Sequence, residues 1–235
     1  MQRKSGYTRH MIIPQRGNIL FLILLAVVLF AALSYAVMGQ REQITGIPRD
    51  KAETFAAQLI QNVNLIDNTM MRAMTVDGVK EWGFDISTSE SNAPNGTCAA
   101  LNCRIYSDRG GPVPMLKIPD WASTATVDGY KYPNFMVANI LDVGTTAPDF
   151  YIRYDQLRKE VCEAINRKLG YTDIDLETAD PTGGTDYGYN GTLTSMPTGV
   201  GTAIGNELAT LKGRKTFCYR AGALGYYFLY VLKER

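Results

Sequence analysis

The most apolar part of the chain lies close to its N-terminus. Residues Ile19–Met38 form a run of twenty residues without a charged side chain. At about 1.5 Å of rise per residue, a helix of this length extends roughly 30 Å, which is the thickness of the hydrocarbon core of a bilayer. The pattern predicts a transmembrane helix over residues 18–38. A secretory signal peptide is the alternative, although its apolar core is normally shorter; the small residues that resemble a cleavage site are Ala31, Ala32, Ser34 and Ala36.

An amphipathic pattern follows a short polar segment. Residues 39–48 contain two glycines and a proline, so we expect the helix to bend or stop there. Asp50 and Glu53 have the spacing of a capping box that would begin a second helix. Apolar residues then recur at helical spacing, namely Ala52, Phe55, Ala56, Leu59, Ile60, Val63, Ile66, Met70 and Met74. We interpret residues 39–75 as a linker and a helix that covers a protein core; a methionine-rich groove for a partner is the alternative.

Beyond Val76 the pattern changes to short apolar runs separated by glycine, proline and asparagine, which is typical of β-strands. The expected strands are Glu81–Ile86, Arg104–Ser107, Pro114–Ile118, Asn134–Ile140, Phe150–Tyr154, Thr216–Tyr219 and Gly225–Leu232. Between them we expect a helix from Asp155 or Gln156 to Leu169, ended by Gly170, and a long loop over residues 170–201.

These elements together predict an α+β fold for an exported domain over residues 76–235. In this fold the long N-terminal helix, made of the membrane span and its amphipathic continuation, packs on a mostly antiparallel sheet. The C-terminal region is expected to be stapled by a disulfide.

The distribution of charge gives the chain an orientation. Lys and Arg number 24 against 23 Asp and Glu, so a strongly basic nucleic-acid binder is excluded and no nucleic-acid partner is expected. Residues 1–17 nevertheless carry four basic side chains and no acidic one: Arg3, Lys4, Arg9 and Arg16. Because positive charge stays on the cytoplasmic side, we expect a single-pass membrane protein with its leader in the cytoplasm and residues 39–235 across the membrane.

The positions of histidine and cysteine limit the kinds of catalytic, metal and disulfide site that the chain can form. The single histidine, His10, lies in the leader, which excludes a histidine-based catalytic triad or a multi-histidine metal site elsewhere, and we expect no enzyme. The four cysteines all lie in the exported part, which indicates two disulfides in an oxidising compartment. Three pairings are open. We favour Cys98 with Cys103 and Cys162 with Cys218, and four reduced thiols are the alternative.

The order of these features resembles the type IV pilins and pseudopilins. The likeness rests on a basic leader ending in QRG, which is followed at once by the apolar helix NILFLILLAVVLFAALSYAV. The segment FYIRYDQLRKEVCEAI, with the distant Cys218, is similar to the helix and disulfide-bounded region of type IVb pilins. About forty positions carry the resemblance.

The resemblance implies a processing site and a set of partners. A prepilin peptidase would cleave after Gly17, so that Asn18 would become the first mature residue. The same peptidase would then methylate the new amino group of Asn18. The mature helix would lie in the lipid of a bacterial inner membrane before assembly, with the C-terminal domain in the periplasm or, after assembly, on an extracellular filament. It would then pack against the helices of other pilin-like subunits, which the small residues of the span would allow to approach closely.

The chain departs from the family at two positions. Leu22 stands where most members carry a glutamate, and Asn18 replaces the usual aromatic first residue. Because the glutamate is thought to pair with the terminal amine of a neighbouring subunit, its absence predicts a minor or tip subunit of a type IV pilus or type II secretion-type filament. The alternative function is a permanently anchored single-span protein whose periplasmic domain binds a ligand or partner.

Three weaker candidates for binding lie in the last third of the chain. Asp173, Asp175, Glu177 and Asp180 are candidate calcium ligands in an acidic stretch that also contains Asp186 and lacks EF-hand spacing, and no other cofactor is expected. The same cluster offers paired carboxylates to a glycosidase, an interpretation that we disfavour. The tyrosines are candidates for binding sugars or peptides, although such residues more often fill a sheet: Tyr187, Tyr189, Tyr219, Tyr226, Tyr227 and Tyr230.

Overall fold

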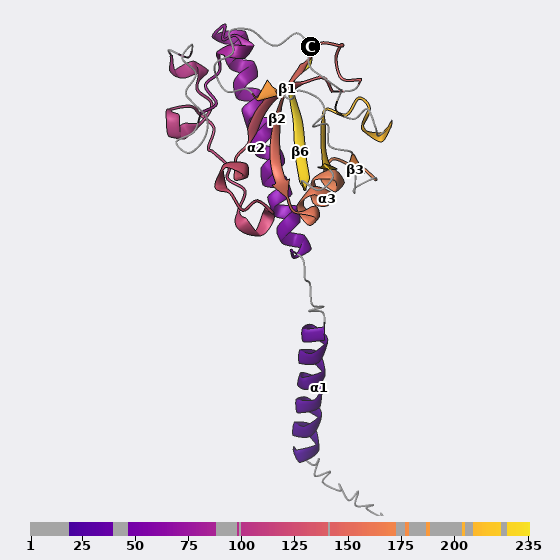
Figure 1. The fold of residues 1–235 in the computed structure, drawn as a ribbon. Coiled ribbons are helices and arrows are strands. Elements are labelled where there is room, and N and C mark those ends of the chain that lie inside the picture. The colour runs from indigo at the N-terminus through magenta and orange to yellow at the C-terminus, as the bar shows by residue number, and fades with distance from the viewer. Residues whose placement is uncertain are drawn as a thin grey trace, which may run out of the picture. The chain divides into compact units, whose positions relative to one another are not determined.

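The computed structural model describes residues 19–39, 47–87, 98, 100–140, 142–172, 177–178, 187–188, 204, 209–221 and 225–235. The chain divides into two compact units, Met1–Thr45 and Gly46–Arg235. Helix α1 (Ile19–Gly39) is the described part of the first unit, and every other element belongs to the second (Figure 1).

Helix α2 (Arg49–Val76) forms the long helical layer of the second unit. Its buried positions follow the predicted apolar face from Ala52 to Met70, with Ile60 and Met74 packed at its margin. The predicted capping box is wrong. Pro48 occupies the N-cap and its carbonyl oxygen accepts the amides of Lys51 and Ala52, so Asp50 lies inside the first turn. There its carboxylate is close to the positive end of the helix dipole.

Three predicted strands between α2 and the sheet are wrong. The 3₁₀ helix η1 (Glu81–Gly83) replaces the start of the first, and only single bridges join Asp85 to Arg104 and Tyr106 to Val113. Residues 114–119 have no regular structure. The apolar positions in these segments are nevertheless buried, among them Phe84, Ile105, Val113 and Ile118. The alternation of polar and apolar residues therefore indicated which side chains are buried. It did not indicate strand pairing, because an irregular chain can bury alternate side chains as well.

The predicted antiparallel sheet is present. Its four main strands are β1 (Asn134–Ala138), β2 (Asp149–Leu157), β5 (Thr216–Ala221) and β6 (Tyr226–Lys233). Two-residue strands β3 (Glu177–Thr178) and β4 (Tyr187–Gly188) extend it, and the order is β3-β5-β6-β2-β1-β4. All pairings are antiparallel except that of β3 with β5. The α+β class is thus confirmed.

Helix α3 (Lys159–Lys168) begins later than predicted. Strand β2 continues to Leu157, which pairs with Tyr226, after a bulge at which Gln156 adopts a φ of 52°. The apolar spacing around Leu157 fits a helix and a strand alike, and the partner strand decides between them. The predicted end at Gly170 is confirmed, because this glycine has a φ of 80° and the amide of Tyr171 bonds back to the carbonyl oxygen of Asn166.

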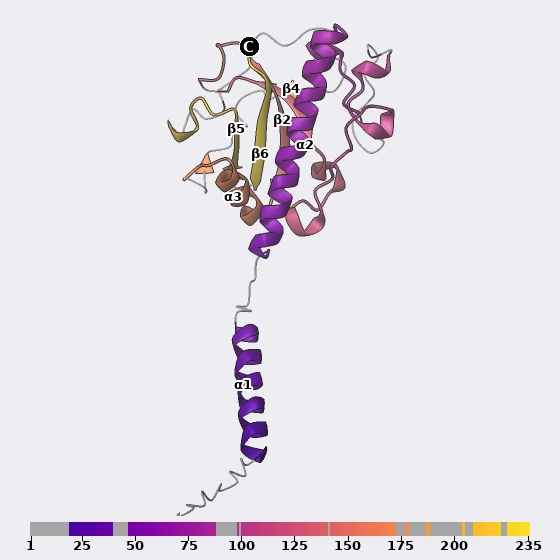
Figure 2. The same cartoon turned by 180° about the vertical axis from the view of Figure 1, so that it is seen from behind.

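The sheet separates two cores. On one face α2 and α3 pack against Phe150, Ile152 and Tyr154 of β2 (Figures 1 and 2). On the other face Tyr151, Tyr219 and Leu229 form a second buried cluster with Ile204 and Leu211. Most of the predicted loop at 170–201 lies outside the described residues.

Candidate functional site

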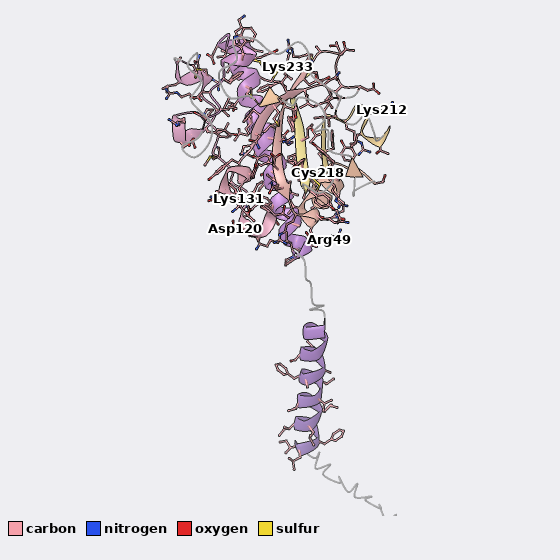
Figure 3. The ribbon with its side chains drawn as sticks, viewed as in Figure 1. Arg49, Asp120, Lys131, Lys212, Cys218 and Lys233 are labelled. Carbon is pink, nitrogen blue, oxygen red and sulfur yellow. A yellow bond between two sulfur atoms is a disulfide. The ribbon has the colours of Figure 1, made fainter. Side chains whose placement is uncertain are left out.

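Both predicted disulfides are formed. Cys98 and Cys103 close a short loop, with their Cα atoms 5.6 Å apart. Cys162 of α3 and Cys218 of β5 are 56 residues apart in the chain and have a Cα separation of 5.3 Å. Because both residues of the second pair are fully buried, this bond fixes α3 to the sheet at the centre of the domain (Figure 3 labels Cys218).

An amide side chain that the sequence analysis missed reinforces this disulfide. Asn166 is completely buried on α3, and its Nδ2 donates to the carbonyl oxygen of Cys218 at 2.7 Å. Its Oδ1 accepts the amide of the same residue at 2.8 Å. The signal in the sequence was a polar residue four positions after Cys162 on the apolar face of a helix, where a buried amide needs partners.

Charged side chains join the two helices. Glu53 of α2 accepts Arg167 at 3.0 Å and contacts Lys168 at 3.4 Å, both from α3. Burial opposes ionisation, but hydrogen bonds and charge attraction from the two cations lower the pKa of Glu53. Further along α2, Asn62 accepts the hydroxyl of the buried Tyr154 at 2.7 Å. The polar residues of α2 therefore hold α3 and β2 in place.

Two hollows of about 390 Å³ lie near the second half of α2. One is lined by Asp67 and by residues of β5 and β6. There the hydroxyl of Tyr230 donates to Asp67 at 3.0 Å; burial raises the pKa of Asp67, and burial together with the Asp67 charge raises the pKa of Tyr230 to about 12. The other hollow lies beside the Cys98–Cys103 loop and is lined by Trp82 and Lys80.

The tyrosine candidates divide between core and surface. Tyr219 and Tyr227 are buried in the second core, where their rings meet edge to face, and are not available to a ligand. Tyr226 and Tyr230 are half-buried against the first core. Tyr187 belongs to β4, and Tyr189 lies outside the described residues.

The calcium candidates fall mostly outside the described residues. Asp173, Asp175, Asp180 and Asp186 all lie there. Glu177 begins β3 and its backbone pairs with Arg220. Within the described ranges, no group of three acidic, histidine or cysteine side chains is placed to hold a metal ion.

Helix α1 is the candidate interaction surface. It contains 21 residues, none of them charged, and its large apolar side chains are 47% to 76% exposed, including Leu22. From Ile19 to Leu33 the exposed apolar residues follow one another around the helix, so this described part has no polar side. The processing residues Gly17 and Asn18 lie outside the described residues.

Side chains of α1 are described for residues 19–34. Within the residues that the structure describes, no helix is both long and apolar enough to cross a membrane.

Comparison with known proteins returned no match. No family model, no curated protein and no solved structure is significantly similar to this chain.

Proposed function

We propose that this chain is a pilin-like or pseudopilin-like structural subunit of a type IV pilus or type II secretion-type filament. The observation that carries the proposal is α1, a helix that is uncharged along its length and apolar on every side. Such a helix needs an apolar environment all around it, which lipid or a bundle of identical helices supplies.

The length of the uncharged run in the sequence supports this proposal. As a helix, the twenty residues Ile19–Met38 would rise about 30 Å, close to the hydrocarbon thickness of a bilayer. The four basic residues of the leader would hold residues 1–17 in the cytoplasm and place the disulfide-bonded domain in the oxidising periplasm. In this proposal lipid covers α1 before assembly, and neighbouring subunits cover it in the filament.

The absence of a carboxylate early in α1 favours a minor or tip position. Leu22 is an exposed apolar residue at the place where most pilins carry a glutamate. A leucine imposes no requirement for a cationic partner in lipid, so the helix does not select a neighbour on one side. We therefore propose that the chain caps or initiates a filament more readily than it repeats along one.

Processing at Gly17 is the test of the pilin-like function. The intact mass of the protein extracted from its host membrane is expected to correspond to a chain that begins at Asn18, with or without one methyl group. A Gly17→Val variant is expected to retain its leader, because a branched side chain enters the extended backbone that the peptidase must hold. A Gly6→Val variant is the matched control and should be processed like the wild type.

The alternative is a fixed single-span anchor with a periplasmic binding domain, and the hollow beside Asp67 and Tyr230 is the observation that favours it. In that case the wild type and both variants would keep residues 1–17. A chain that begins near Met1 in every sample would therefore overturn the pilin-like proposal and leave the anchor.

A further inference from the structure

A tryptophan and a lysine meet where α2 begins. The Nζ of Lys51 lies 4.1 Å from the ring centre of Trp121, and the same ring packs edge to face against Phe55 at 5.4 Å. Lys51 is exposed and Trp121 is half-buried. An amphipathic aromatic ring beside a cation is the combination that proteins place at the boundary between lipid headgroups and hydrocarbon.

The loop that carries Trp121 also exposes apolar side chains. Val127 is 58% and Tyr130 48% exposed, in a segment whose other exposed residues are polar or glycine. Lys131 holds this segment by bonding Asp120 at 2.7 Å and Asp128 at 2.9 Å, and Lys117 contacts Asp128 at 3.3 Å. The two aspartates are thereby neutralised, and the apolar side chains project from a loop that is fixed to the domain.

Backbone hydrogen bonds bring the start of α3 to the same end. The amide of Arg158 donates to the carbonyl oxygen of Ala122 at 2.9 Å. Residues 49–51, 117–131 and 158–160 together contain six basic and four acidic side chains. Arg49 and Lys159 also contact Glu53 and Glu163, at 3.8 and 3.6 Å, but the two cationic side chains are 77% and 48% exposed and stay accessible from solvent. Figure 3 labels three of them, Arg49, Asp120 and Lys131, which gather where α2 begins, while Lys233 lies at the opposite end of the domain. We call residues 49–51, 117–131 and 158–160 the Trp121 surface.

The number of residues between α1 and α2 sets an upper limit on the distance between their facing ends. Only ten backbone steps separate Gly39 from Arg49, which span at most about 35 Å in any conformation. If α1 occupies a bilayer, the first turn of α2 is therefore within that distance of the membrane surface.

We propose that the Trp121 surface rests on the anionic headgroup layer of the membrane that holds α1. Trp121, Val127 and Tyr130 enter the headgroup boundary, and the cations of the first turn of α2 approach the phosphates. This inference depends on the membrane anchoring of α1 in the proposed function. Its consequence is a domain that lies against the bilayer on one defined side before assembly.

The two tryptophans allow a direct test, because Trp121 lies beside the beginning of α2 and Trp82 beside its end. Trp121 packs on Phe55, whereas Trp82 shares a hollow with Asp77, roughly 33 Å further along the helix. The full chain would be reconstituted in vesicles of phosphatidylethanolamine and phosphatidylglycerol with brominated acyl chains, which quench tryptophan fluorescence at close range. The Trp82→Phe variant then reports on Trp121 alone, and the Trp121→Phe variant reports on Trp82 alone.

Quenching of Trp121 is expected to exceed quenching of Trp82 by about twofold or more, because only the former lies at the boundary. Adding Val127→Ser and Tyr130→Ser to the Trp82→Phe chain should remove most of this quenching without lowering the melting temperature, since both side chains are exposed. Lys51→Glu should weaken it, and Lys80→Glu, the matched change near Trp82, should not.

Flotation of the vesicles separates this inference from the anchoring on which it depends. A chain that floats with vesicles while both tryptophans are quenched equally, or not at all, overturns the Trp121 surface and leaves the anchor intact. A chain that does not float overturns the anchor and the inference together. Preferential quenching that survives the Val127→Ser and Tyr130→Ser changes overturns the assignment to this loop.

Discussion

At the scale of single residues, buried polar groups determine how the domain is held together. Asn166 satisfies both backbone groups of Cys218, and Asn62 accepts the hydroxyl of Tyr154. Each bond contributes about 1 kcal/mol, but loss of one partner leaves a buried group unsatisfied at a cost of about 1–3 kcal/mol. Uncharged amides thus connect α2 and α3 to the sheet without the desolvation cost of a charge.

Asp149 makes the stability of the domain depend on pH. This carboxyl group is completely buried in β2 and accepts the amides of Arg235 at 3.0 Å and Ile140 at 3.3 Å. Burial outweighs these hydrogen bonds and raises the pKa of Asp149 from 3.8 to about 6.

Because the folded state binds this proton more tightly than the unfolded state, the contribution of Asp149 is fully present below pH 4 and is lost as the pH rises through 6. We expect the wild type to lose up to about 3 kcal/mol over this window relative to Asp149→Asn, which cannot titrate. Urea unfolding of both proteins at several pH values measures the difference. A constant difference in the free energy of unfolding would contradict the pKa assigned to this group.

At the scale of elements, α3 depends on one covalent bond and one helix partner. Its Cys162 is bonded to β5, and its Arg167 and Lys168 contact Glu53 of α2. With only ten residues, α3 is too short to be stable alone. Its position is set by these contacts and by burial of its apolar side.

Removal of the two disulfides is expected to have unequal effects. A Cys162→Ala, Cys218→Ala double variant should lose about 4 kcal/mol of unfolding free energy, because the bond closes a long loop. The matched Cys98→Ala, Cys103→Ala variant should lose only about 2 kcal/mol. Guanidinium unfolding in the absence of reductant measures both. Equal losses would show that loop closure is not the main contribution of these bonds.

At the scale of the whole molecule, the chain combines an uncharged helix with a domain that has its own cores. The second unit, Gly46–Arg235, contains both buried clusters, both disulfides and all described strands. None of the residues in the two buried clusters comes from α1. The packing that stabilises the described cores of the domain therefore does not depend on the environment of α1.

A chain that begins at Gly46 is consequently expected to fold as the full chain does. Its near-ultraviolet circular dichroism should retain the signal of the packed aromatic core, and its urea midpoint should match that of the full chain in detergent, because no core residue is removed. Unlike the full chain, it should not float with vesicles. Loss of the cooperative transition would mean that α1 contributes to the fold of the domain.

The sequence alone determined the features that depend on local pattern or on chemistry fixed by residue type. The apolar face of α2, the end of α3 at Gly170, the strands around Phe135, Ile152 and Phe228, and both disulfides could be read from spacing and composition, because helix and strand periods differ and glycine alone tolerates a left-handed turn without strain. The same reading gives the basic leader and uncharged helix on which the proposed function rests.

Where one local pattern fits more than one secondary structure, only the tertiary structure decided which of them the segment adopts. Apolar alternation near Ile105 and Ile118 produced buried irregular chain, and Leu157 joined β2 because Tyr226 lies opposite. Asp50 and Glu53 have the spacing of a capping box, but Pro48 occupies the N-cap of α2. Glu53 forms an ion pair with Arg167 of α3 instead. Pairing partners, buried amides such as Asn166 and the meeting of Trp121 with Lys51 all join residues far apart in the chain, and no local period carries information about such contacts.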